Sequence, residues 1–332
     1  MKITEFRQKI KSAEKEHLLK LTEEIYKALS KSKREENIDP IIDDILSGNS
    51  KTRKEKKPKD IPFDTLKAEI TEFLENANND LYFSPNRVIP KKKRSNWRFE
   101  VKNFIKELDK ITSSDPNAGQ AAKLYKDIYN ILSRSCHFYI FVSDNPFSAV
   151  GITQADFYAK LVLRYFSLGY TRERISEMLE IAVSDLIDMN TLNSKLINEF
   201  ISFLKTNDMR TLAIEISKEK ISAHEEKLPN KKDKKFIFYS GNYDIEEQIN
   251  NLCEVILKLS ILLCESAEGV EYYFKHNRAC DSEIVLYRAL NIIDSFNAAD
   301  KLWLDVYDKA VKKGIKPRDS LVREYKNKKK QV

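Results

Sequence analysis

Histidine is scarce in this chain of 332 residues, and the four histidines are His17, His137, His224 and His276. Glu14 and His17 form an E-x-x-H pair, and this three-residue spacing puts both side chains on one face of a helix. Di-iron helical bundles need two such pairs together with two further glutamates. None of the other histidines follows a glutamate at this spacing. We therefore expect no metal site and no cofactor.

Cys136 and His137 are a second pair that could do chemistry, because a thiol in contact with an imidazole forms a nucleophile and its base. Neighbouring residues of a helix point about 100° apart, so these two side chains do not face each other. Cys136 also lies on an apolar helical stripe, as do Cys253 and Cys264, which is typical of buried, reduced thiols. Glycine-rich phosphate loops and G-x-S-x-G motifs do not occur in the sequence. These motifs predict no reaction.

The stretch from residue 79 to 98 combines basic and aromatic side chains around two prolines, and its first part, residues 79–94, follows neither the helical nor the strand period. Its candidate binding residues are Tyr82, Phe83, Arg87, Lys91, Lys92, Lys93, Arg94, Trp97 and Arg98. Arginine and aromatic side chains are favoured at protein interfaces, and they also stack on bases and hold phosphates. The alternative is a packing loop that buries Tyr82, Phe83 and Trp97 between helical layers. Both interpretations stay open.

The net charge of +7 comes from 58 Lys and Arg against 51 Asp and Glu, with basic runs at 51–59, 91–98 and 326–330. Lysines outnumber arginines by 43 to 15, as coding in an AT-rich genome produces. A dedicated phosphate binder favours arginine, because the guanidinium group pairs bidentately with phosphate. The charge balance alone therefore does not predict nucleic-acid binding, and solvated linkers and tails explain the runs equally well.

Residues 168–189 have the apolar spacing of a helix-turn-helix, with Thr171 as the cap of the first helix. Two features argue against DNA binding. Glu180 stands where the turn usually has glycine, and the second helix would carry Asp185 and Asp188, which repel phosphates. We interpret the stretch as an ordinary helical hairpin.

Glycine and proline together number 16 residues, about 5% of the chain, where roughly 12% is average. Sheet-based folds and nucleotide-binding loops use many glycines at turns, so an all-α protein is predicted. Short connections between amphipathic helices favour antiparallel neighbours. We therefore expect an irregular superhelical stack of helical hairpins, similar in architecture to HEAT or TPR arrays but without a sequence repeat.

Five parts are expected along the chain: an N-terminal helical hairpin at 1–47, a basic linker at 48–61, a central helical region at 62–225, a polar linker at 226–242 and a C-terminal helical region with a basic tail at 243–332. Periodicity and caps predict helices at 63–78, 95–111, 115–141, 153–169, 171–181, 184–205, 208–225, 243–268, 281–296 and 297–313. Thr153 with Asp156 forms a capping box, and residues 235–243 are the only plausible strand. The tail after residue 322 is expected to fray.

The most apolar stretch, residues 255–264, is too short to span a bilayer, and the first residues lack the apolar segment of a signal peptide. We expect a cytoplasmic protein with no membrane partner. The predicted function is that of a non-enzymatic binding or scaffold module whose partner is another protein. The alternative is a sequence-tolerant nucleic-acid binder that uses residues 51–59 and 91–98, and an uncharacterised enzyme is the third interpretation.

Overall fold

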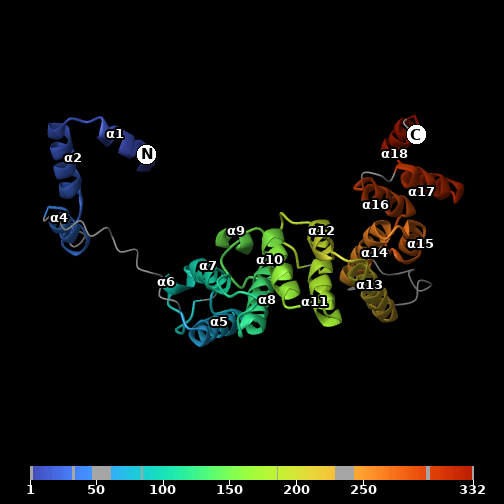
Figure 1. Ribbon diagram of the computed structural model, residues 1–332, viewed down its shortest axis with the longest axis horizontal. Coiled ribbons are helices and arrows are strands. Elements are labelled where there is room, and N and C mark those ends of the chain that lie inside the picture. The colour runs from blue at the N-terminus through green and yellow to red at the C-terminus, as the bar shows by residue number, and fades with distance from the viewer. Residues whose placement is uncertain are drawn as a thin grey trace. The chain divides into compact units, whose positions relative to one another are not determined.

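The computed structural model describes residues 3–31, 34–46, 61–83, 85–184, 186–228, 243–296 and 300–330. The regular structure of these residues is helical, without a strand, which confirms the all-α prediction (Figure 1). The chain divides into two units, residues 1–60 and 61–332. The basic linker up to residue 60, the polar linker from residue 229 and the expected strand up to residue 242 lie outside the described residues.

The first unit contains α1 (Ile3–Lys11), α2 (Lys15–Ala28), the π-helical turn η1 (Arg34–Ile38) and α4 (Asp39–Leu46). Asp39 is the first residue of α4 and follows η1 directly. The Tyr26 hydroxyl donates a 2.8 Å hydrogen bond to its carboxylate. This bond ties the end of α2 to the start of α4.

The second unit carries the remaining helices in a chain-order array. They are α5 (Phe63–Asn78), α6 (Lys91–Arg94), α7 (Trp97–Leu108), α8 (Ala118–Ser135), α9 (Pro146–Val150), α10 (Gln154–Ser167), α11 (Arg172–Val183), α12 (Asn193–Phe203), α13 (Asn207–Lys227), α14 (Tyr243–Leu262), α15 (Ser266–His276), α16 (Ser282–Asp294), α17 (Asp300–Lys312) and α18 (Asp319–Lys328). The principal helix contacts join elements at most three places apart in this order. Packing between chain neighbours is typical of helical stacks, so the structure agrees with the predicted architecture.

Local capping signals position several of these helices where the sequence predicts them. The Thr153 hydroxyl accepts from the Asp156 amide at 3.1 Å and donates to the Asp156 carboxylate at 2.7 Å. Gly169 follows α10 with φ of +107°, a conformation that residues with a side chain rarely adopt. The Thr171 side chain then caps α11. Side-chain bonds within one turn depend on sequence neighbours alone, which is why the sequence predicts them.

The helix expected at 115–141 is shorter in the structure, because α8 runs from Ala118 to Ser135. Residues 136–145 form turns and bends, and Phe141 is buried there. Its ring stacks on Trp97 with centroids 4.1 Å apart and lies 5.9 Å from Phe73. Aromatic burial against α7 and α5 therefore outweighs continuation of the helix.

The helix expected at 184–205 begins only with α12 at Asn193, and the described residues between 184 and 192 are not helical. The buried side chain of Gln154 explains this. Its Nε2 donates to the Leu186 carbonyl at 2.9 Å, and its carbonyl accepts from the Asp188 amide at 2.7 Å. These bonds replace the hydrogen bonds of a helix. The second helix of a helix-turn-helix is thus not formed in the described part of this stretch.

The single helix expected at 243–268 is two helices, α14 and α15, with Cys264 at φ +64° between them. Cys253 is buried as predicted, whereas Cys264 is exposed at the turn. Gly269 lies against α14 so closely that a Cβ atom on it would stand 2.5 Å from the Ser260 Cβ. The break in the expected helix thus lets α15 fold back and pack closely on α14 at a glycine.

The tail, expected to fray, forms α18. Leu321 is buried, and the Lys328 ammonium pairs with Asp294 at 2.6 Å and Asp300 at 2.7 Å. A small apolar cluster there contains Leu286, Leu290, Ile293, Trp303, Val306, Tyr307, Ala310 and Leu321. The main core extends from Leu66 to Ile292, so the predicted central and C-terminal regions share one core. α13 and α14 pack on each other inside it.

Candidate functional site

The structure places the predicted binding residues on two sides of one segment. Tyr82 and Trp97 are buried in the aromatic core around Phe141. Arg94 is half-buried, and the other predicted residues are exposed: Phe83, Arg87, Lys91, Lys92, Lys93 and Arg98. The segment therefore packs through two of its aromatic side chains and presents basic side chains on its outside.

Side-chain hydrogen bonds fix the irregular backbone of this segment. The Asn86 carbonyl accepts from the amides of Val88 and Ile89 at 3.0 and 2.7 Å. The Asn86 amide group donates to the Leu81 carbonyl at 2.7 Å, and Arg94 donates to the Ile89 carbonyl at 2.8 Å. Because Arg94 holds the backbone, it contributes to the shape of the segment.

The fixed segment walls a groove of about 690 Å³ that also has lining residues from α5 and α7. The floor is formed by buried apolar side chains, namely Phe73, Tyr82, Ile89 and Phe104. Val88 and Phe99 line the same groove but are largely exposed to solvent. The groove thus combines a ready-made apolar floor with two apolar side chains that have no cover in the described structure.

The groove is acidic. Glu69 and Glu72 reach it from α5 and Glu100 from α7, whereas Lys93 is the one cationic side chain among its described lining residues. Burial raises the pKa of Glu100, although the nearby Lys93 ammonium and a hydrogen bond with Tyr82 oppose this. Burial and the facing carboxylates likewise raise the pKa of the Tyr82 hydroxyl. A ligand that brings positive charge would stabilise the three carboxylates.

The basic side chains outside the groove form a different surface. Arg87, Lys91 and Lys92 are exposed and do not line the groove. The Arg98 guanidinium lies over the Phe99 ring, 5.0 Å from its centroid. Phe83 pairs with Tyr139, also exposed, at a centroid distance of 5.6 Å. The Phe83 and Tyr139 rings are thus exposed outside the groove.

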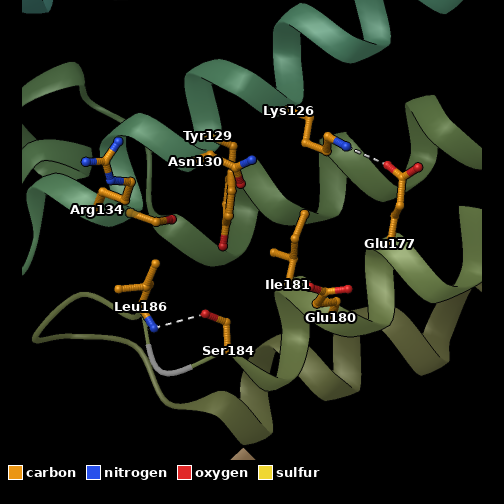
Figure 2. Close-up of a pocket in the computed structure, with 10 residues that line it drawn as sticks. Lys126, Tyr129, Asn130, Arg134, Glu177, Glu180, Ile181, Ser184 and Leu186 are labelled. Carbon is orange, nitrogen blue, oxygen red and sulfur yellow. Dashed lines mark hydrogen bonds and ion pairs between the residues drawn. The ribbon is translucent and has the colours of Figure 1, made fainter. Parts of the chain in front are cut away.

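A second, polar cleft of about 390 Å³ lies between α8 and α11 (Figure 2). Its charged side chains already have partners. Lys126 forms a 2.6 Å ion pair with Glu177 across the cleft, and Glu180 pairs with Lys220 at 3.2 Å. Arg134 donates to the Asn78 side chain at 2.8 Å. These pairs leave little charge to bind an ion.

The hydroxyl groups of this cleft are also engaged. Gln154 Nε2 donates to the Tyr129 hydroxyl at 3.1 Å and to Ser133 Oγ at 3.2 Å. Complete burial raises the pKa of Tyr129. The described lining residues include no imidazole or thiol that could serve as a base or nucleophile beside them. The cleft geometry therefore fits the anchoring of Leu186 and Asp188 by Gln154.

Cys136 and His137 have separate partners. The thiol donates to the Leu132 carbonyl at 3.3 Å, and burial raises its pKa to about 12. His137 Nε2 lies 2.9 Å from the Ile187 carbonyl. Glu14, the N-cap of α2, and His17 are exposed, and the described residues contain no group of three or more His, Cys, Asp or Glu side chains placed to hold a metal ion.

The acidic wall of the groove was missed by the sequence analysis, which followed the basic side chains. Glu69 and Glu72 are three residues apart, so they lie on one face of α5. That spacing was an available signal, but it occurs on many solvated helices. Only the packing of α5 on α7 brings these carboxylates near Glu100.

In the part of the chain that the structure describes, every helix is too short or too polar to cross a membrane. Comparisons of the chain with protein-family models, curated proteins and solved structures found no match.

Proposed function

We propose that this protein is a non-enzymatic binding module that holds an amphipathic helical segment of another protein in the groove between α5 and α7. The observation that carries the proposal is the combination of an apolar floor with carboxylates of Glu69, Glu72 and Glu100 on its walls. Helix-in-groove recognition uses the same combination of apolar anchors and complementary charge.

The proposed partner has a distinct chemistry. Its apolar side chains would cover Val88 and Phe99, and its lysines or arginines would face the carboxylates of α5 and α7. A nucleic acid fits this groove poorly, because Glu69, Glu72 and Glu100 would repel its phosphates. The charge of the groove therefore favours a basic peptide.

The cysteines and the length of the helical stack indicate the setting in which the protein acts. The four cysteines are free thiols, and this agrees with a reducing compartment such as the cytoplasm. The stack continues for many helices beyond α7, and extended helical stacks commonly serve as scaffolds. We propose a cytoplasmic scaffold in which the groove is one docking point.

Nucleic-acid binding is the second candidate function. It is favoured by the exposed basic side chains of Arg87, Lys91 and Lys92 and by the exposed aromatic pair of Phe83 and Tyr139. Aromatic rings stack on bases while lysines neutralise phosphates. The two functions differ in the side chains that they require.

Fluorescence anisotropy with two labelled helical peptides tests the proposed function. Both peptides have the same leucine pattern, but one carries lysine and the other glutamate on its polar positions. The lysine peptide is expected to bind at least tenfold more tightly. Phe99→Ala should weaken its binding several-fold, whereas Phe138→Ala should not, because the two rings are equally exposed, at 59% and 58%, and only Phe99 lines the groove.

Charge variants complete the experiment. Glu72→Lys is expected to weaken binding of the lysine peptide, whereas Glu75→Lys, on the same helix outside the groove, should change it little. Equal losses in the two variants would show nonspecific attraction and would contradict the proposal.

A labelled single-stranded RNA serves as the competing ligand. RNA binding that persists at physiological salt and is lost in Lys91→Glu/Lys92→Glu would establish the second candidate instead.

A further inference from the structure

The described helices of the N-terminal unit, within residues 3–31 and 34–46, bury little of their apolar surface. Among the described residues of its helices, none is buried, and the apolar clusters of the protein begin at Leu66. Large aliphatic side chains are exposed instead: Leu19, Leu21, Ile25, Ile42, Ile45 and Leu46. Ordering about 40 residues costs far more free energy than such a unit gains from the little apolar surface that it buries. These helices therefore need a partner surface to be stable.

Apolar side chains of α2 form a stripe with regular spacing, of which Leu18 is half-buried and the other three are exposed. Leu18, Leu21, Ile25 and Ala28 follow one another at intervals of three, four and three residues. This is the spacing of the two inward-facing positions of a coiled coil. Leu21 and Ile25 are 39% and 46% exposed, so this stripe, which we call the α2 stripe, is not covered within the unit. α4 adds Ile42, Ile45 and Leu46 as further uncovered surface.

The charge around the α2 stripe is balanced. Residues 3–46 contain nine lysines and arginines against ten aspartates and glutamates. Lys15 and Glu24 are the charged residues that flank the stripe, and Glu24 is already paired with Lys27 at 3.5 Å. A neutral surface does not select a partner of opposite charge, but it can meet an identical surface without strong repulsion.

The α2 stripe is also complementary to itself. When two copies of α2 pair antiparallel, Leu18 of one copy lies opposite Ala28 of the other, and Leu21 lies opposite Ile25. Each large side chain at the ends thus meets a small one, and the arrangement has twofold symmetry. Isologous contacts of this kind are the commonest way in which identical chains associate.

We propose that the N-terminal unit is a self-association module, in which the α2 stripe pairs antiparallel with the same stripe of a second copy. The α4 side chains enlarge the contact. Counted over both copies, the exposed aliphatic side chains offer on the order of 1,000 Å² of apolar surface, near the lower limit of specific interfaces. The dimer is therefore weak, with a dissociation constant of roughly micromolar order.

Sedimentation equilibrium of the 332-residue chain over a wide concentration range tests the inference. The mass is expected to rise from 38.8 kDa to twice that value as the concentration passes the micromolar range. Leu21→Lys/Ile25→Lys should remain monomeric at every concentration. The control Leu163→Lys/Leu192→Lys introduces the same charges at exposed leucines of the second unit and should dimerise like the wild type.

A conservative variant keeps the result interpretable if the lysine variant loses helix. Ile25→Leu preserves the apolar stripe and should dimerise within a fewfold of the wild type. A wild-type protein that is monomeric throughout would overturn the inference. So would a dimer that persists in Leu21→Lys/Ile25→Lys, because its interface would lie elsewhere. Neither outcome bears on peptide binding in the groove, which is measured separately.

Discussion

Helices α2 and α14 both carry apolar side chains at helical spacing, but α14 is also apolar around much of its circumference, and the two have opposite states of burial. α14 has eleven buried residues, and α2 has none among those described. α14 packs against α13, α15 and α16, so that its apolar side chains are covered from several directions. Even the Lys258 ammonium is buried there, with partners Glu254 at 2.6 Å and Asn198 at 2.7 Å. An apolar periodicity therefore defines a face, and the neighbouring elements decide whether it is covered.

The difference in burial between the two units can be measured with two leucines, Leu108 of the second unit and Leu19 of the first. Leu108 in α7 is completely buried, so Leu108→Ala leaves a cavity and should lower the free energy of unfolding by about 3–5 kcal/mol. Urea denaturation followed by circular dichroism measures this change. A loss below about 1.5 kcal/mol would mean that the core around α7 is packed more loosely than the structure shows.

A glycine tests how closely the helices of the second unit approach. Gly269→Ala should destabilise the protein by about 1–3 kcal/mol, because its Cβ would collide with Ser260. Gly119→Ala is the control, since no atom lies within 4 Å of the new Cβ, and better helix propensity should stabilise α8 by up to about 1 kcal/mol. Thermal unfolding compares the two variants. The same sign for both would contradict the close crossing of α14 and α15.

An ion pair of the second unit gives its stability a dependence on pH. Burial by itself would raise the pKa of Glu225, but hydrogen bonds from His276 and Arg278 outweigh it and lower the pKa. A lowered carboxylate pKa stabilises the fold above the unfolded value of about 4.3, and this contribution is lost as the pH falls through the folded pKa.

Glu225→Gln should therefore cost about 1–2 kcal/mol at pH 7, and the difference from the wild type should shrink below about pH 4. Urea denaturation at several pH values checks this. Glu226→Gln, the same change at the exposed neighbouring residue, should have little effect at any pH. A difference for Glu225→Gln that stays constant down to pH 3 would refute the role of its charge.

The smallest effect is expected in the first unit. Leu19 is 61% exposed and lies outside the α2 stripe, so Leu19→Ala should change the free energy of unfolding by less than about 0.5 kcal/mol. It is the counterpart of Leu108→Ala in the same denaturation assay. A loss as large as that of the buried leucine would show that the first unit has a core around Leu19.

The sequence predicted much of the helical structure, and its errors lie where contacts outside the local turn decide the backbone. α5 occupies the expected residues, and α10 and α11 begin at the expected threonine caps. Expected helices are interrupted at residues 136–145, 184–192 and 263–265, and the tail forms α18 instead of fraying. Phe141 stacks on Trp97, and Gln154 forms hydrogen bonds with the backbone of Leu186 and Asp188. Gly269 packs closely against Ser260. A periodicity calculated along the chain contains no information on such contacts.

The candidate site, too, was predicted from the sequence only in part. The sequence indicated that residues 79–94 are irregular and that residues 79–98 are rich in side chains suited to binding. It did not separate Tyr82 and Trp97, which are buried, from Phe83 and the lysines, which are exposed. It also did not place Glu69 and Glu72 near Glu100. These facts depend on how α5 and α7 pack, which no local pattern encodes.

The sequence by itself determined that this protein is helical, because scarcity of glycine, side-chain caps and apolar spacing act within a few residues of each other. The tertiary structure decided which apolar faces are covered, where the long helices break and which charges meet in the groove. Burial is a property of two surfaces in contact. The sequence specifies each surface, but the area removed from water is known only when the partner surface is in place.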